Sequence, residues 1–187
     1  MRLFVALEIP SAVRENLAAL LKSLRAVSPQ TRWVRPENLH VTVKFIGEVP
    51  ETKLADLRGA LAGARCHQPV TLDFRGLGFF PNDEHPRVLW AGIAASPNLN
   101  TLAADIEKAT EKLGIPREQR PFSPHLTLTR FEPPVLPEKL RAAIQENAAR
   151  DFGSLRTVQF HLIESKLKPS GAEYTTLESY PFAAAEA

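Results

Sequence analysis

Two short stretches of this chain share the pattern Arg-Pro-x-x-x-His-apolar-Thr-apolar. The first is RPENLHVTV, residues 35–43, and the second is RPFSPHLTL, residues 120–128. Successive side chains of a strand point to opposite faces, so His40 would share a face with Thr42, and His125 with Thr127. The apolar residues between them would face a core. The pattern therefore predicts two equivalent strands, each of which presents an imidazole and a hydroxyl group.

The repetition extends beyond these motifs. Residues 2–6, RLFVA, align at the same offset with residues 87–91, RVLWA, and each run is typical of a buried strand. Leucines at helical spacing follow both runs, with Ser11 as the expected N-cap of the first helix and Gly114 and Pro116 as the end of the second. Each half then reads as strand, helix, histidine strand, helix and strand.

This order predicts an α+β fold. We expect residues 1–187 to form a single two-lobed domain with repeats at approximately 1–80 and 86–165. Pro169-Ser170-Gly171 predicts the turn of a C-terminal hairpin over residues 166–180. The lobes would be related by a pseudo-twofold axis, each an antiparallel sheet with helices on its outer face. The cleft between two lobes is a common place for a ligand site.

Net charge and cysteine content limit the contacts and the cellular compartment that we expect. Net charge is only +2, from 23 basic and 21 acidic residues, so any contact with nucleic acid should be local. Basic side chains do flank both motifs: Arg32, Arg35, Lys44, Arg117, Arg120 and Arg130. The single cysteine, Cys66, which we expect near a helix end, allows no internal disulfide and suits a reducing cytoplasm.

No apolar run approaches the ~20 residues of a membrane span. The N-terminal apolar stretch is interrupted by Glu8 and reads as a first strand, not as a signal peptide. We therefore expect a cytoplasmic protein with no membrane partner, and a monomer by default.

Two imidazoles and two hydroxyls suit acid–base chemistry on a phosphate. One imidazole can act as the base while the other acts as the acid, and threonine hydroxyls can donate hydrogen bonds to phosphate oxygens. The sequence has no H-E-x-x-H, no C-x-x-C, no P-loop and no G-x-G-x-x-G. We therefore expect neither a metal nor a cofactor.

Other candidates are weaker. His67, His85 and His161 are expected at the surface, although His161 alternates onto a face that could line the cleft. Phe79, Phe80 and Trp90 could stack on a nucleobase, but Trp90 aligns with Val5 inside a strand, which favours the core. Trp33 and Tyr174 remain open between the two interpretations.

Four segments carry a family resemblance: WVRPENLHVTVKFIGEV, GFFPNDEHPRVLWAGI, RPFSPHLTLTR and LKPSGAEYTTL. Together they resemble the bacterial and archaeal RNA 2',3'-cyclic phosphodiesterases, also called 2'-5' RNA ligases, of the two-histidine phosphoesterase superfamily with its HxTx motifs. The resemblance covers essentially the whole chain. It departs from the family pattern at Thr129, where a small apolar residue is expected, and at Gly171-Ala172, where Gly-Pro is expected.

The resemblance implies metal-independent hydrolysis of RNA 2',3'-cyclic phosphate ends, or of a cyclic nucleotide, to 2'-phosphomonoesters. It implies that His40 is the proton donor to the leaving 3' oxygen and His125 the proton acceptor that activates water. Thr42 and Thr127 would hold the phosphate, with help from Arg130. The residues alone leave open which histidine takes which role.

Three other interpretations remain. Reversible 2'-5' RNA ligation would use the same site, since both directions cross one transition state. A nucleotide- or RNA-binding module without turnover would not need both imidazoles. A purely structural or interaction protein would leave the matched polar pairs unexplained.

Overall fold

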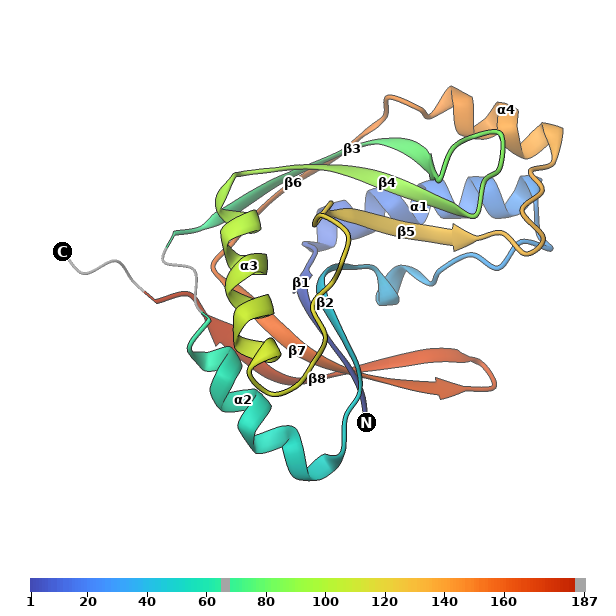
Figure 1. Cartoon of the computed structure of the whole chain (residues 1–187). Coiled ribbons are helices and arrows are strands. Elements are labelled where there is room, and N and C mark those ends of the chain that lie inside the picture. The colour runs from blue at the N-terminus through green and yellow to red at the C-terminus, as the bar shows by residue number, and fades with distance from the viewer. Residues whose placement is uncertain (65–67, 184–187) are drawn as a thin grey trace.

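The computed structural model describes residues 1–64 and 68–183, so the expectations for Cys66 and His67 lie outside the described residues. Along the chain the elements, shown in Figure 1, are β1 (Arg2–Glu8), α1 (Ser11–Val27), η1 (Pro36–Asn38), β2 (His40–Glu48), η2 (Glu51–Lys53), α2 (Leu54–Ala62), β3 (Val70–Phe80), β4 (Val88–Ala95), α3 (Asn98–Glu111), β5 (His125–Arg130), α4 (Glu138–Glu146), β6 (Asp151–Thr157), β7 (Gln159–Lys168) and β8 (Gly171–Pro181).

In the described part of the chain, these strands form two four-stranded antiparallel sheets. The order is β2-β1-β7-β8 in the first, here sheet A, and β5-β4-β3-β6 in the second, sheet B. Helix α1 packs on β6 of sheet B and contacts α4, while α3 packs on β2 of sheet A and contacts α2 (Figure 1). The expected α+β fold with two similar lobes is therefore confirmed.

The sheets do not coincide with the two halves of the sequence. Strand β3 belongs to the first repeat but pairs with β4 of the second, and β7 belongs to the second repeat but pairs with β1 of the first. Each sheet thus receives its third strand from the other half of the chain. The hairpin turn at Pro169 and Ser170 joins β7 to β8, which completes sheet A.

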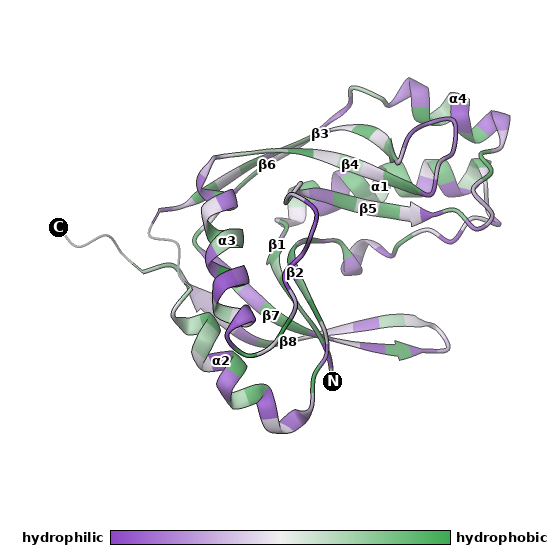
Figure 2. Cartoon of the chain, viewed as in Figure 1, coloured by the Kyte–Doolittle hydropathy of each residue, from purple (hydrophilic) through white to green (hydrophobic). Residues whose placement is uncertain are grey.

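Most of the buried apolar residues form one continuous core shared by both sheets. Strand β1 is buried along nearly its whole length, as its run of apolar residues predicts. Helix α1 buries one stripe, Val13, Leu17, Leu20, Leu21 and Leu24, because these residues recur at helical spacing. Figure 2 shows the same alternation of hydrophobic and hydrophilic residues along α3.

The predicted N-cap of α1 is wrong. Ser11 is the first helical residue, and the capping position is taken by Pro10, whose extended backbone offers no side-chain hydrogen bond. The backbone N–H of Arg14 donates to the carbonyl of Pro10 at 3.0 Å, so the first turn of the helix closes on Pro10.

The segment before β2 connects the two sheets. The backbone N–H of Val34 donates to the carbonyl of Leu128 at 2.9 Å, and Trp33 forms an isolated bridge with Thr129. The Trp33 side chain is buried and its Nε1 donates to the carbonyl of Ser28, so this residue belongs to the core. Over residues 1–64 and 68–183, no helix is both long and apolar enough to cross a membrane.

Candidate active site

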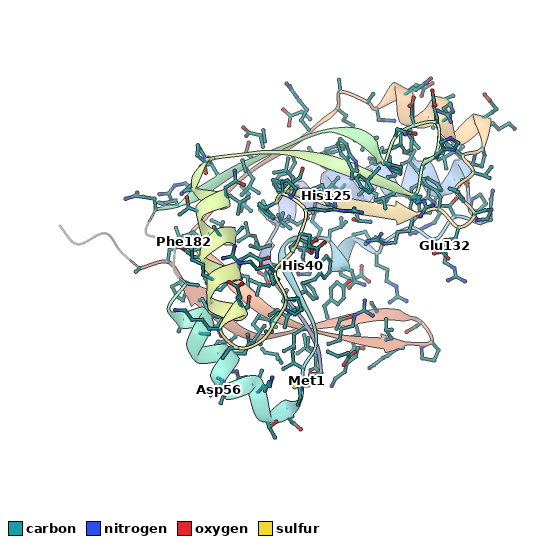
Figure 3. The ribbon with its side chains drawn as sticks, in the orientation of Figure 1. Met1, His40, Asp56, His125, Glu132 and Phe182 are labelled. Carbon is teal, nitrogen blue, oxygen red and sulfur yellow. The ribbon has the colours of Figure 1, made fainter. Side chains whose placement is uncertain are left out.

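The two His-x-Thr elements lie on edge strands that approach each other. His40 and Thr42 are on β2, at the edge of sheet A, and His125 and Thr127 are on β5, at the edge of sheet B. Strands β2 and β5 are in contact, and Figure 3 shows His40 and His125 in the same central region, between the two sheets. The structure therefore brings the two predicted imidazoles to one part of the molecule.

Both imidazoles are held in the same way. Nδ1 of His40 lies 3.1 Å from the carbonyl oxygen of Asn38, and Nδ1 of His125 lies 2.9 Å from that of Ser123. A carbonyl can only accept, so Nδ1 carries the proton in both rings. In each ring Nε2 is consequently the nitrogen left to give or take a proton. The histidines are thus equivalent in orientation as well as in sequence.

The surroundings of the two rings differ. His125 is exposed, whereas His40 is partly buried with its ring edge-on to those of Phe4 and Tyr174, at centroid distances of 6.3 and 5.7 Å. Burial lowers the pKa of His40, as do the charges of Arg14 and His161, while the Asn38 carbonyl raises it. The carboxylate of Glu8, directly opposite His40 in the sheet, also raises this pKa.

Each histidine strand contains a β-bulge at the same place. In β2 the pairing with β1 shifts between Thr42 and Lys44, and in β5 the pairing with β4 shifts between Thr127 and Thr129. A bulge adds one residue and so resets the alternation of faces. Lys44 and Thr129 therefore turn inward, at 4% and 1% exposure, and the residue after each turns back to the histidine face.

The inward residues tie the two motifs together. Lys44 donates to Glu107 on α3 at 3.0 Å and to the carbonyl of Pro116 at 2.8 Å, in the segment that leads to His125. Thr129 donates to the carbonyl of Arg32 at 2.7 Å, in the segment that leads to His40. Thr129, where the family pattern has a small apolar residue, thus makes a hydrogen bond that links the two motifs.

The outward residues after the bulges are Phe45 and Arg130. Arg130 pairs with Val88 in the sheet and is exposed, and its side chain has no hydrogen-bond or ion-pair partner among the described residues, so its charge faces solvent. Beside it lies a hollow of about 340 Å³ that Arg87 also lines. Phe45 is 65% exposed and pairs with Phe4. Sequence reasoning missed Phe45, because strict alternation assigns it to the core face.

The arginine of each motif supports the sheet that carries its histidine. Arg35 donates to the carbonyl of Ser170 at the tip of the β7–β8 hairpin, while Asn38 donates to the carbonyl of Ala172 at 2.9 Å. The guanidinium of Arg120 lies over the ring of Phe80, 5.3 Å from its centroid, at the end of β3. Through these contacts, Arg35 and Arg120 each attach the segment before a histidine strand to a neighbouring strand or hairpin of the same sheet.

The remaining candidates have varied positions. His161 faces the same side as Thr42, since both pair with Ala6, but it is buried and its Nδ1 lies 2.8 Å from Oγ of Ser179. His85 is exposed in the loop after β3. Trp90, expected in the core, is instead half-buried and pairs with Thr127, with its ring across Gly78, where an added Cβ would meet it at 2.2 Å.

The other aromatic and basic candidates also differ. Tyr174 contacts His40 and Phe4, Phe80 is 48% exposed, and Phe79 packs against the core. Arg117 pairs with Glu111 at the surface. Over the part of the chain that is described, no three His, Cys, Asp or Glu side chains gather as metal ligands would.

Comparison with known proteins gives consistent matches over nearly the whole chain. The profile of a family described as LigT like Phosphoesterase matches residues 7–90 and 93–174. The RNA 2',3'-cyclic phosphodiesterase of Archaeoglobus fulgidus is 37% identical over 180 residues, which cover 96% of this chain and 99% of that protein.

Two solved structures are similar in fold and sequence. TT0787 of Thermus thermophilus superposes with a TM-score of 0.79 at 34% identity and full coverage of both chains. Escherichia coli LigT complexed with 3'-AMP has a TM-score of 0.74 at 28% identity, with 97% of each chain covered.

Proposed function

This chain belongs to the LigT-like phosphoesterase family, and we propose that it hydrolyses the 2',3'-cyclic phosphate at RNA ends, or a 2',3'-cyclic nucleotide, to a 2'-phosphomonoester. The identity of 37% to an RNA 2',3'-cyclic phosphodiesterase over almost all of both chains supports this reaction. The observation that carries the mechanism is the matched pair of Nδ1 contacts, which leaves Nε2 of both His40 and His125 for proton transfer.

Water attacks the phosphorus from one side while the ribose 3' oxygen leaves from the other. Nε2 of His125 takes a proton from the water as the new P–O bond forms. Nε2–H of His40 gives a proton to the 3' oxygen as the old P–O bond breaks. His125 ends charged and His40 neutral, and exchange with solvent restores both. Each positioned acid or base contributes about 10²–10⁴-fold.

The polar side chains on the same faces hold the phosphate. The hydroxyls of Thr42 and Thr127 donate hydrogen bonds to the two non-bridging oxygens, since each lies two residues beyond a histidine on its strand. Arg130 adds a positive charge, and its planar guanidinium can donate two parallel hydrogen bonds. With two imidazoles to move the protons, the reaction requires no metal or cofactor.

The chain acts as a monomer, because one copy contains both motifs and so needs no partner to complete the site. It acts in the cytoplasm, which a single cysteine suits.

A product assay tests the proposal. The protein is incubated with 2',3'-cyclic AMP or with an RNA that ends in a cyclic phosphate, with and without EDTA, and the product is identified by its phosphorus NMR shift. We expect a 2'-phosphate at equal rates in both conditions. Loss of activity in EDTA refutes the metal-free mechanism, and a 3'-phosphate product reverses the assigned leaving oxygen. Binding without turnover favours the non-catalytic module.

A further inference from the structure

Asn38 makes hydrogen bonds from both its backbone and its side chain, and they lead in different directions. Its carbonyl oxygen lies 3.1 Å from Nδ1 of His40 and accepts the proton on that nitrogen. Its side-chain Nδ2 donates to the carbonyl of Ala172 in β8, at 2.9 Å. One half-buried residue therefore connects the ring of His40 to the β7–β8 hairpin.

The carbonyl that holds His40 belongs to a very short helix, η1. Its single turn is closed by the backbone N–H of Asn38, which donates to the carbonyl of Arg35 at 2.9 Å. The N–H of Leu39 donates to the carbonyl of Pro36 at 3.2 Å. A turn of 3₁₀-helix has poor hydrogen-bond geometry, and so short a helix is not stable on its own. The direction of the Asn38 carbonyl therefore depends on the contacts that η1 makes with neighbouring elements.

Side chains attach η1 to its neighbours on two sides. On one side, Arg14 of α1 donates to the carbonyl of Pro36. On the other side, Arg35 donates to the carbonyl of Ser170 at the hairpin tip, close to the hydrogen bond from the Asn38 amide. A hollow of about 260 Å³ is lined by residues of both η1 and the hairpin. Because that space is open, hydrogen bonds rather than close packing hold η1 against the hairpin.

The same hairpin flanks the ring of His40. Tyr174 lies two residues beyond Ala172 on β8, so their side chains share a face of the strand. The rings of Tyr174 and His40 are 5.7 Å apart at 64°, an edge-to-face arrangement. The hairpin thus contacts His40 directly through Tyr174 and indirectly through Asn38.

The second histidine lacks this link. Ser123 is the counterpart of Asn38, two residues before His125, and its carbonyl oxygen lies 2.9 Å from Nδ1 of that ring. Over residues 1–64 and 68–183, however, the hydroxyl of Ser123 has no hydrogen-bond partner and no aromatic ring packs against His125. The two imidazoles share one type of backbone contact, but in the described structure a side chain anchors only that of His40.

We propose that Asn38 is a positioning residue for His40: its side-chain amide anchors η1 to the hairpin, and this fixes the carbonyl that orients the imidazole. The inference rests on the proposed function, because the orientation matters for turnover only if His40 transfers a proton. With the carbonyl in place, the neutral ring carries its proton on Nδ1, and Nε2 is the nitrogen that exchanges a proton with the substrate. Without the anchor, the ring can rotate or take up the other tautomer. Such a misplacement can cost about 10²-fold in rate.

Asn38→Ala tests the proposal, because it removes the amide donor and keeps the backbone carbonyl. We expect kcat for 2',3'-cyclic AMP to fall by about 10–100-fold, with KM nearly unchanged. Asn38→Gln keeps an amide that can donate, and it should recover part of the loss.

Asn16→Ala is the matched control. The Asn16 amide also donates to a backbone carbonyl distant in sequence, that of Phe152, at 3.0 Å, but it links α1 to β6. The substitution should lower Tm as Asn38→Ala does and leave kcat unchanged. Circular dichroism checks the fold of every variant.

A double variant separates positioning of His40 from general damage to the site. If Asn38 acts through His40, Asn38→Ala should cause no further loss of kcat in a protein that already carries His40→Ala. Ser123→Ala gives the comparison in the other half of the chain. It should lower kcat much less than Asn38→Ala does, because the Ser123 hydroxyl anchors nothing in the described structure.

NMR reports the state of the rings without turnover. The nitrogen shifts of a neutral imidazole show which nitrogen carries the proton. We expect the Nδ1–H tautomer at both His40 and His125 in the unaltered protein. In Asn38→Ala, His40 should become a mixture of tautomers, while the unchanged signals of His125 serve as the internal reference.

The outcomes distinguish this inference from the proposed function. The same kcat in Asn38→Ala as in Asn16→Ala, a further loss in the His40→Ala background, or an unchanged His40 tautomer overturns the positioning role. If the unaltered protein hydrolyses neither 2',3'-cyclic AMP nor an RNA with a cyclic phosphate end, the proposed function fails. In that case the nitrogen shifts of His40 still decide whether Asn38 orients the ring.

Discussion

Lys44 and Thr129 occupy equivalent positions in the two halves of the chain, and each donates a hydrogen bond to the backbone that leads into the other half's histidine motif. Both residues turn inward at a β-bulge, and both are almost completely buried. The two histidine strands are therefore linked reciprocally. We infer that this pair of ties helps to fix the separation of the two imidazoles.

Removal of either tie should cost both stability and activity. Lys44→Met leaves the carboxylate of Glu107 without its charged partner, and loss of one member of a buried pair costs about 3 kcal/mol. Thr129→Val removes one hydrogen bond, at a cost of about 1–2 kcal/mol. Urea denaturation measures both, and kcat at saturating substrate should also fall. The exposed ion pair of Arg117 provides the control, since Arg117→Met should change stability by less than about 1 kcal/mol.

Single alanine substitutions at His40 and His125 should each lower kcat by about 10²–10⁴-fold, because in the proposed mechanism each removes one proton transfer. The kcat of the double variant should be only slightly lower than that of the less active single variant, since the two groups act as one unit. Steady-state hydrolysis of 2',3'-cyclic AMP measures all three, with His85→Ala as the exposed histidine control. Near-normal turnover in either single variant would refute the two-histidine mechanism.

The phosphate contacts should be worth less than the proton transfers. In the proposed site, Thr42→Val and Thr127→Val each remove one hydrogen bond to the phosphate, which corresponds to a loss of about 10–100-fold in kcat/KM. Arg130→Gln should have a similar effect, and Arg130→Lys should recover only part of it because lysine lacks the planar fork. Arg75→Gln, which removes an exposed ion pair with Asp151, should leave kcat/KM unchanged.

Glu8→Gln tests which histidine is the acid. The Glu8 carboxylate raises the pKa of His40, so its removal lowers that pKa further and leaves less of the charged ring at pH 7. If His40 is the proton donor, kcat/KM at pH 7 should fall, and the deficit should vanish as the pH is lowered. If His40 is the acceptor, the variant should instead be faster than the parent at low pH. NMR titration of His40 measures the shift directly, with Glu146→Gln as the control.

The buried histidine on sheet A should make the fold sensitive to acid. Burial lowers the pKa of His161 from its ordinary value of about 6.5. At a pH below 6.5 the folded state therefore binds fewer protons at this residue than the unfolded state does. The free energy of unfolding that depends on the neutral His161 ring is fully present above that pH. It is lost as the pH falls through the pKa that His161 has in the folded protein. Tm should drop between pH 7.5 and pH 5.5, and less so in His161→Gln. An equal drop in the two proteins would assign the acid sensitivity to other groups.

The histidines and threonines could be found from the sequence because they precede the bulges. Up to Thr42 and Thr127 the strands alternate with period two, so simple parity predicts the correct face. Beyond them parity fails. Strict alternation assigns Lys44 and Thr129 to the histidine face and Phe45 and Arg130 to the core, whereas the structure shows the reverse. A bulge leaves no composition signal, because it depends on pairing with a neighbouring strand.

The sequence also did not predict that β3 and β7 each join the sheet of the other half of the chain. Strand β3 alternates between buried and exposed residues over residues 70–75, whereas β7 is buried on both faces over residues 160–163. Such patterns indicate which faces of a strand are buried but not which neighbour the strand joins. Both strands carry buried apolar residues, so either could have been expected to pair within its own half of the chain. Helices α1 and α3 could be predicted because the spacing of their apolar residues is a local property of the sequence. Strand pairing depends on distant residues and leaves no such local pattern.

The exchanged strands also order events during synthesis. Sheet A cannot close until β7, near the end of the chain, has emerged from the ribosome, although β1 and β2 emerge first. Strand β1 must therefore remain paired only with β2 while nearly the whole protein is translated. Late closure of this kind favours slow folding, because distant segments must meet before their contacts stabilise anything. Nascent chains that stop before β7 carry an open edge at β1, and they are the species most prone to aggregate.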